Sequence, residues 1–83
     1  MNITIYSTTT CSYCHVLKAW LDKRDIAYDY KLTDEDDTAM EEFMSVNDGM
    51  LSVPLTIIKK DDGTVAKILG FDQAKLTLEL NTN

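Results

Sequence analysis

The sequence predicts an α/β protein in which a mixed four-stranded sheet is flanked by helices, with the element order β-α-β-α-β-β-α. Three observations carry this prediction. Short apolar–polar alternations typical of strands take turns with longer stripes of helical spacing in the first half of the chain. The helix-length segment between the first two strands predicts that they run parallel, because parallel neighbours need a long crossover. A tight turn in the second half predicts an antiparallel hairpin.

The first three elements follow from periodicity. Residues 2–7 alternate Ile3 and Ile5 with polar neighbours, which is the period-two pattern of a strand. Residues 12–24 carry an apolar stripe of three- and four-residue spacing, which predicts a helix packed on one face. This stripe consists of Tyr13, Val16, Leu17, Trp20 and Leu21. Residues 26–32 alternate again and are rich in strand-forming side chains.

A second helix is expected after Thr33, which is a natural N-cap residue. Its apolar stripe is Ala39, Met40, Phe43 and Met44, and it should end near Asn47-Asp48-Gly49. Acidic residues gather at 34–37 and 41–42. We interpret them as a solvated helix face with acids favourably placed in the first turn; a docking patch for a basic partner is the alternative.

The hairpin comes next. Residues 53–58 predict a strand that is opened by the chain's only proline, Pro54. Asp61-Asp62-Gly63 predicts a tight turn, and residues 64–69 predict the return strand.

A final helix should complete the fold. Gly70 ends the return strand, and Asp72 can cap a helix that runs to about residue 80, with Leu76 and Leu80 on one face. No repeat or linker-like segment interrupts the chain, so residues 1–83 are expected to form a single domain.

The chemistry-bearing motif is Cys11-Ser12-Tyr13-Cys14, which contains the only two cysteines. It lies directly after the first predicted strand, at the start of the first helix. Unpaired N–H groups and the positive end of the helix dipole favour a thiolate there, and the thiolate is the nucleophile in disulfide exchange. One helical turn separates the sulfurs, so the pair can close and open. A static disulfide is the bland alternative, but such a short loop constrains the unfolded chain very little.

Composition excludes several classes of partner. The 83 residues carry a formal net charge of −6 with a pI of about 4.4, which argues against nucleic acid and against anionic membrane surfaces. No stretch approaches the roughly 18 apolar residues of a membrane span, and the first residues do not resemble a signal peptide. We therefore expect a cytoplasmic protein, and in that reducing compartment a close cysteine pair is more often catalytic or metal-binding than structural.

Three segments together resemble the glutaredoxins and their close relatives within the thioredoxin fold. The first is Tyr6-Ser7-Thr8-Thr9-Thr10-Cys11-Ser12-Tyr13-Cys14. The second is Ser52-Val53-Pro54, which is similar to the family's Thr-Val-Pro, and the third is Gly70-Phe71-Asp72, which is similar to the turn before its last helix. The order of elements agrees from residue 2 to about residue 80. The resemblance implies a thioredoxin-like (glutaredoxin) fold.

The resemblance also implies roles for individual residues. Cys11 is the attacking thiolate and Cys14 the resolving thiol. Pro54 is the family's cis-proline, which would set the backbone of Val53 beside Cys11 to pair with an extended substrate strand. The implied substrate-binding residues are Ser12, Tyr13, Val53, Pro54, Gly70, Phe71 and Asp72, and no metal ligand is expected.

Departures from the family pattern bear on the reductant. Thr8 stands where glutaredoxins usually carry a lysine that helps hold glutathione, Ser12 replaces a proline, and the family's double glycine is Leu69-Gly70. These features resemble the glutaredoxin-like NrdH-redoxins, which a flavin-dependent thioredoxin reductase reduces and which feed ribonucleotide reductase. The alternative is a glutathione-dependent glutaredoxin whose site is completed by basic residues from elsewhere in the chain, for example Lys18 or Lys59.

The function expected from the sequence is thus a small, monomeric dithiol–disulfide oxidoreductase with no tightly bound cofactor. Its partners would be a disulfide-containing protein, with ribonucleotide reductase as one candidate, and either thioredoxin reductase or glutathione. Other readings remain open. Ser12 is compatible with a [2Fe–2S] cluster bridged between two glutathione-binding chains. Cys11 to His15 is a formal match to a haem-attachment motif, but no export signal accompanies it. One histidine and two cysteines are too few for a structural zinc site.

Overall fold

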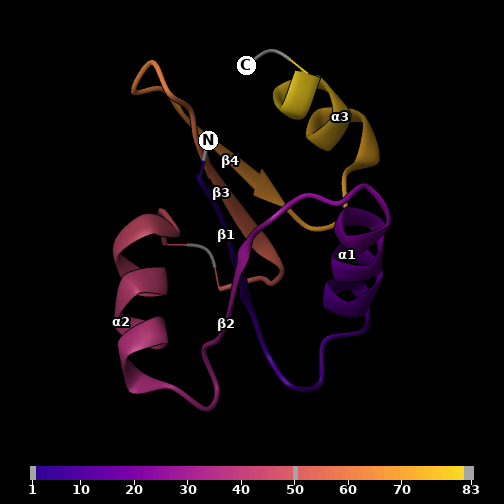
Figure 1. Ribbon diagram of the computed structural model, residues 1–83. Coiled ribbons are helices and arrows are strands. Elements are labelled where there is room, and N and C mark those ends of the chain that lie inside the picture. Colours follow the sequence, from indigo (N-terminus) through magenta and orange to yellow (C-terminus); the bar gives the residue numbers. More distant parts are fainter. Residues whose placement is uncertain (1, 50, 82–83) are drawn as a thin grey trace.

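The computed structural model describes residues 2–49 and 51–81, and it has the predicted order of elements (Figure 1). The strands are β1 (Asn2–Ser7), β2 (Asp29–Leu32), β3 (Leu55–Lys59) and β4 (Val65–Leu69). The helices are α1 (Ser12–Lys23), α2 (Asp37–Val46) and α3 (Gln73–Asn81).

The four strands form one mixed sheet in the order β2-β1-β3-β4. β1 pairs in parallel with β2, with Thr4 opposite Asp29, as the crossover through α1 predicts. β3 is antiparallel to both of its neighbours, with Ile58 opposite Ile3 of β1 and Ala66 of β4. The central strand β1 therefore carries the chain directly to the start of α1.

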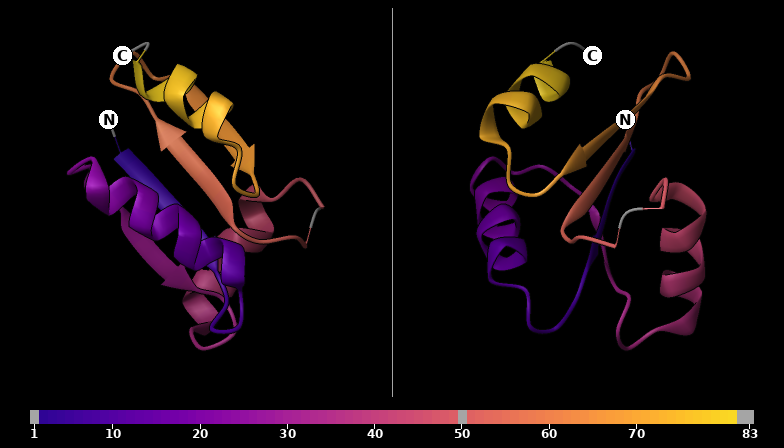
Figure 2. Two further views of the ribbon diagram at one scale, coloured as in Figure 1. Left: turned by 90° about the vertical axis from the view of Figure 1, so that its right-hand side faces the viewer. Right: turned by 180° about the vertical axis from the view of Figure 1, so that it is seen from behind.

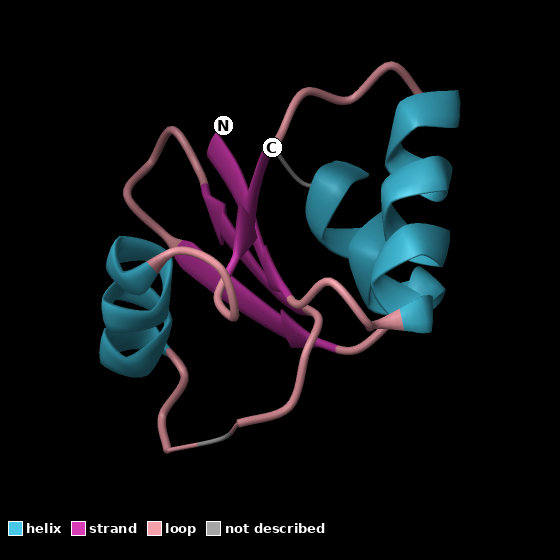
Figure 3. Cartoon of the chain, turned by 90° about the horizontal axis from the view of Figure 1, so that it is seen from below, coloured by secondary structure: helices cyan, strands magenta, loops and turns pink. Residues whose placement is uncertain are grey.

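Helices cover both faces of the sheet, with α1 and α3 on one face and α2 on the other (Figures 2 and 3). Alternation along the strands produces two cores, because successive side chains point to opposite faces. The larger core is Ile3, Ile5, Leu17, Trp20, Leu21, Ile58, Ile68 and Leu76, and the smaller is Tyr6, Phe43, Leu55 and Ile57. Burying each large apolar side chain contributes about 1.5–3 kcal/mol, so the larger core fixes α1, and the cysteines at its start, against the sheet.

The second strand is shorter than the sequence predicts. Residues 26–28 do not belong to β2, because the chain is still leaving α1 at this point. Asp25 has a positive φ of 55°, and the backbone N–H of Ile26 donates back to the carbonyl of Leu21 at 3.2 Å. That N–H is not available to a ladder with β1, and pairing begins only at Asp29.

The predicted N-cap of α2 is wrong. The cap is Asp36, whose carboxylate accepts from the N–H groups of Thr38 at 2.9 Å and Ala39 at 3.4 Å. Thr33 is buried instead, and both its N–H and its hydroxyl donate to the carbonyl of Ser7. The predicted apolar stripe is narrower than expected, because Ala39 and Phe43 are buried whereas Met40 and Met44 are exposed.

The second half of the chain follows the prediction closely. β3 begins one residue after Pro54, and the turn between β3 and β4 is closed by Gly63 at φ 92° and by the Asp62 carboxylate, which accepts from the N–H and hydroxyl of Thr64. Asp72 caps α3 by accepting from the N–H of Lys75 at 3.1 Å. Leu76 is buried and Leu80 packs against the larger core, as predicted.

Candidate active site

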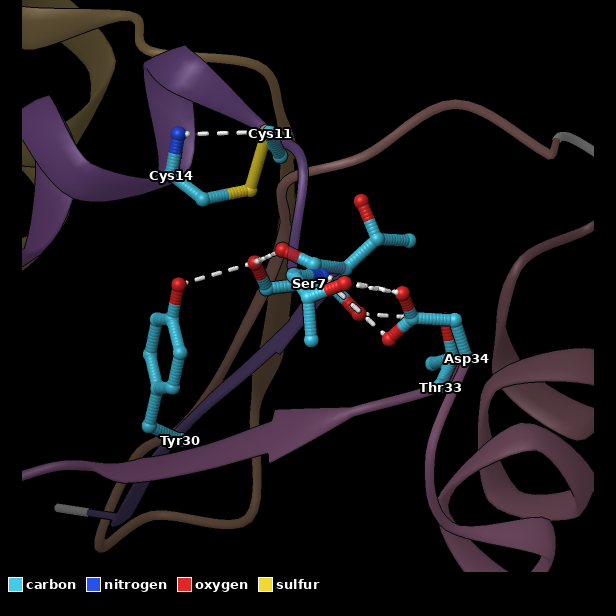
Figure 4. The surroundings of a disulfide bond; sticks show 8 residues. Ser7, Cys11, Cys14, Tyr30, Thr33 and Asp34 are labelled. Atoms are coloured by element: carbon cyan, nitrogen blue, oxygen red, sulfur yellow. Dashed lines mark hydrogen bonds between the residues drawn. A yellow bond between two sulfur atoms is a disulfide. The ribbon is translucent and has the colours of Figure 1, made fainter.

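The two cysteines lie at the start of α1, after the loop that follows β1, and they form a disulfide (Figure 4). Cys11 is the N-cap of α1, and its Sγ accepts a hydrogen bond from the N–H of Cys14 at 3.2 Å. The Cα atoms of the pair are 5.3 Å apart. The sulfur of Cys11 thus occupies the position at which helix N-termini bind negative charge.

The two sulfurs differ in access to solvent. Cys14 is fully buried on the inner side of α1, whereas Cys11 is partly exposed. Ser12 and Tyr13, between them, are exposed, and the Tyr13 side chain is 68% exposed. An incoming disulfide can therefore reach Cys11 but not Cys14.

A groove of about 520 Å³ lies beside the motif. Its walls bring Tyr13 together with Val53, Pro54 and residues 69–73. The peptide bond between Val53 and Pro54 is cis, as the resemblance implies. The carbonyl of Pro54 accepts from the N–H of Gly70 at 2.8 Å, and Gly70 has a positive φ of 74°, which favours glycine.

The structure therefore gathers most of the predicted substrate-binding residues at one place. Tyr13, Val53, Pro54, Gly70, Phe71 and Asp72 all line the groove. Ser12 is not among its described lining residues, and neither are the two cysteines. Phe71 also packs edge-on against Trp20, with ring centroids 6.3 Å apart, and this contact connects the groove lining to α1.

The described lining of this groove contains no lysine or arginine, and Asp72 is its one charged residue. Neither Lys18 nor Lys59 is among its described lining residues. The ammonium of Lys18 lies 5.0 Å from the ring centroid of Tyr30. Lys59 ends β3 four residues beyond Leu55, which places it about 13 Å further along the sheet.

Sequence reasoning missed a hydrogen-bond network below the disulfide (Figure 4). Ser7, the last residue of β1, is fully buried. Its Oγ lies 2.8 Å from the hydroxyl of Tyr30 and donates to the carbonyl of Thr8 at 3.2 Å. Its carbonyl accepts from the N–H of Thr33 at 2.8 Å and from the Thr33 hydroxyl at 3.1 Å. β2 and the turn after it thus fix the end of β1.

Asp34 extends this network to the β1–α1 loop, which we define as residues 8–11. Its Oδ2 accepts from the Thr9 hydroxyl at 2.6 Å and from the Thr9 N–H at 3.1 Å, and its Oδ1 lies 3.2 Å from the same N–H. These bonds, led by the one from the hydroxyl, lower the pKa of Asp34 below its usual value. In the sequence this aspartate is one acid in a run, so no local signal distinguishes it.

The described residues hold no cluster of three or more His, Cys, Asp or Glu side chains arranged to bind a metal ion. Among the described helices, none is both long and apolar enough to cross a membrane.

The chain is similar in sequence to a family model and to several known proteins. The family model described as Glutaredoxin matches residues 3–62. Mycoredoxin 1 of Corynebacterium glutamicum is 43% identical over 65 residues, covering 78% of this chain and 77% of that protein. The glutaredoxin-like protein NrdH of Lactococcus lactis is 31% identical over 74 residues, covering 89% of this chain and 97% of that protein.

Solved structures of similar proteins have the same overall fold as this chain. The thioredoxin-like protein BC3987 matches with a TM-score of 0.75 and 27% identity, covering 93% of this chain and 97% of that one. The NrdH-redoxin of Escherichia coli matches with a TM-score of 0.73 over 94% of this chain and 93% of that one; at 24% identity it supports the fold alone.

Proposed function

Because this chain belongs to the glutaredoxin family of thiol–disulfide oxidoreductases, we propose that it is a dithiol electron carrier that reduces protein disulfides through Cys11 and Cys14. The observation that carries this proposal is the difference between the two sulfurs: Cys11 is partly exposed at the N-terminus of α1, and Cys14 is fully buried one turn behind it.

The reaction proceeds in two exchanges. The Cys11 thiolate attacks one sulfur of the substrate disulfide, forms a mixed disulfide and releases the other substrate sulfur as a thiolate. Cys14, after losing its proton, then attacks the Cys11 sulfur, forms the Cys11–Cys14 disulfide and releases the second substrate thiolate. Two electrons have passed to the substrate, and an external reductant must return two electrons to this pair.

The groove beside the motif is the proposed binding surface for the substrate. Tyr13 contributes an exposed aromatic face, and Val53, next to Pro54, contributes backbone near the start of β3. An extended segment of the substrate protein can pair with such a backbone and place its disulfide against Cys11. Gly70, Phe71 and Asp72 also line the groove, and Ser12 contributes an exposed hydroxyl at the first turn of α1.

We propose a flavin-dependent thioredoxin reductase, rather than glutathione, as the reductant. The absence of any cation from the described groove lining supports this choice, because glutathione carries carboxylates that such sites bind through charge-assisted hydrogen bonds. The net charge of −6 also disfavours an anionic tripeptide. The NrdH relative motivates ribonucleotide reductase as one recipient, and we keep a monomeric, cytoplasmic protein as part of the proposal.

The test is parallel reduction of the oxidised protein by thioredoxin reductase with NADPH and by glutathione, followed as free thiols formed over time. We expect the first route to be faster. Thr8→Lys, which restores the cation found in glutaredoxins, should raise the glutathione-dependent rate selectively, and Thr8→Gln is the uncharged control. Rapid reduction of the wild type by glutathione, together with no reduction by thioredoxin reductase, would replace this proposal with the glutathione-dependent one.

A further inference from the structure

The β1–α1 loop has little support of its own. Thr9 and Thr10 are exposed. Within the described residues the one backbone hydrogen bond that closes the loop runs from the N–H of Cys11 to the carbonyl of Thr8, at a long 3.4 Å. Apart from the N-cap contact of Cys11 with α1, the position of this loop therefore depends on contacts from elsewhere in the chain.

Those contacts come from the segment that follows β2. Thr33 holds the last residue of β1 through the carbonyl of Ser7, and this bond continues the pairing of the parallel strands. Asp34 goes one step further, because its carboxylate reaches beyond the end of the sheet and binds both the N–H and the hydroxyl of Thr9. The strand pairing does not require this second contact.

The Asp34–Thr9 contact has the features of a persistent one. Its shortest bond is 2.6 Å, and hydrogen bonds to an ionised carboxylate are about twice as strong as neutral ones. The lowered pKa of Asp34 keeps the carboxylate ionised at any pH where the thiols react. Both residues are exposed, so the contact contributes little to the packing of the core.

We propose that Asp34 is a positioning residue for disulfide exchange, which holds the β1–α1 loop through Thr9 so that the Cys11 sulfur stays at the N-terminus of α1. This inference rests on the proposed role of Cys11 as the attacking thiolate. When the loop is released, Cys11 leaves the hydrogen bond from the Cys14 N–H more often, and the thiolate loses part of its stabilisation.

A rival effect of Asp34 has the opposite sign. A carboxylate near a thiolate repels it, so removal of the charge alone would favour the thiolate. Ions in solution screen this repulsion between exposed groups, whereas the geometric effect acts through direct bonds. The two effects can therefore be separated by comparing variants that remove the charge with variants that remove the contact.

The experiment measures the alkylation rate of Cys11 by iodoacetamide as a function of pH, with Cys14→Ser in every protein. Asp34→Ala should slow alkylation near neutral pH about twofold to tenfold, which is the effect of losing one net hydrogen bond, and should move the pH profile to higher pH. Asp34→Asn keeps an acceptor for Thr9 and should restore most of the rate. Thr9→Val loses the hydroxyl contact but keeps the N–H contact, so its alkylation rate should lie between those of Asp34→Ala and the protein with both residues intact.

Controls make the result specific. Glu35→Ala removes a neighbouring exposed carboxylate that forms no side-chain hydrogen bond or ion pair within the described residues, and it should leave the profile unchanged. Adding Thr9→Val to Asp34→Ala should not slow alkylation any further, because both changes break the same Asp34–Thr9 contact. Urea unfolding of each variant confirms that the proteins compared are folded.

The proposal is overturned if Asp34→Ala behaves like Glu35→Ala, or if Asp34→Ala and Asp34→Asn both accelerate alkylation, which is the signature of charge alone. The assay needs no disulfide substrate. Failure of the proposed function would appear separately, as a wild-type protein that alkylates normally at Cys11 but does not reduce protein disulfides.

Discussion

At the scale of single residues, the reactivity of this protein depends on where two sulfurs lie relative to one helix end. Cys11 caps α1 and accepts the Cys14 N–H. In reduced Cys14→Ser protein, Cys11 should therefore be half ionised below the value of about 8.5 for a free cysteine, and at about 7.5 or lower. Thiolate absorbance against pH measures this directly. Half-ionisation at or above the free value would contradict the helix-end account.

The unequal burial of the cysteines predicts unequal phenotypes. Cys14→Ser should accumulate a stable mixed disulfide with the substrate, because the exposed Cys11 still attacks but nothing resolves the intermediate. Cys11→Ser should abolish the reaction, because Cys14 is fully buried. Mass spectrometry of the non-reduced reaction mixture distinguishes the two. Similar residual turnover in both single variants would argue against these separate roles.

The sequence revealed these two residues and not the ones that support them. A pair of cysteines at one-turn spacing is a local signal, whereas the partners of Ser7 and Thr9 lie 23 to 26 residues away in the chain. Serine, threonine and aspartate are common in loops for many reasons, and only the parallel pairing of β1 with β2 brings these particular ones together. Such contacts have no periodicity from which they could be predicted.

At the scale of elements, the caps decide where helices begin, and α2 offers a clear test. Asp36→Ala should lower the free energy of unfolding by about 1 kcal/mol, the usual cost of losing an N-cap acceptor, because Thr38 and Ala39 lose their shared carboxylate. Glu35→Ala, one residue earlier, is the control and should have little effect. Equal urea midpoints for the two variants would show that Asp36 does not stabilise the helix.

The same region shows how far local signals reach. Thr33 and Asp36 are both acceptable N-cap residues, and the sequence favoured the one nearer the strand. The structure uses Thr33 to continue the contact with β1, so the helix starts three residues later than expected. The sequence also predicts a second strand that begins three residues too early, at Ile26 instead of Asp29. The hydrogen bond from the Ile26 N–H back to α1 cannot be recognised from an alternating pattern. The hairpin and α3, whose turn residues act locally, were predicted well.

At the scale of the whole molecule, the small core should make single truncations costly. Leu17 is fully buried between α1 and the sheet, and Leu17→Ala should cost about 2–5 kcal/mol out of a total that is about 5–15 kcal/mol for such domains. Val16→Ala, at an adjacent position that is 48% exposed, should change stability by no more than about 0.5 kcal/mol. Thermal unfolding of both variants would show whether burial in the larger core determines the stability of the fold.

The prediction that residues 1–83 form a single domain stays a prediction.

Alkaline pH should weaken the fold through Tyr28. Burial, together with the 2.7 Å hydrogen bond to Asp22, raises the pKa of Tyr28 to about 12. Because the folded pKa lies above the unfolded value of about 10, this contribution to stability is complete below about pH 10 and is lost as pH rises towards about 12. In Tyr28→Phe, the decline of the urea midpoint over that range should be shallower. Identical declines in both proteins would show that other groups cause it.

The position of Cys11 as the N-cap of α1 also couples electron transfer to folding. Any free energy that the helix end supplies to the thiolate exists only while the helix exists, so unfolding removes it. A thiol that ionises at lower pH in the folded chain than in the unfolded chain adds stability as pH rises between those two values. Reduced Cys14→Ser protein, in which Cys11 is the one thiol, should therefore gain resistance to urea as pH rises towards about 8.5, relative to the oxidised wild-type protein, which has no thiol to ionise. The reactivity of this carrier is then a property of the intact fold, and it disappears whenever the chain opens.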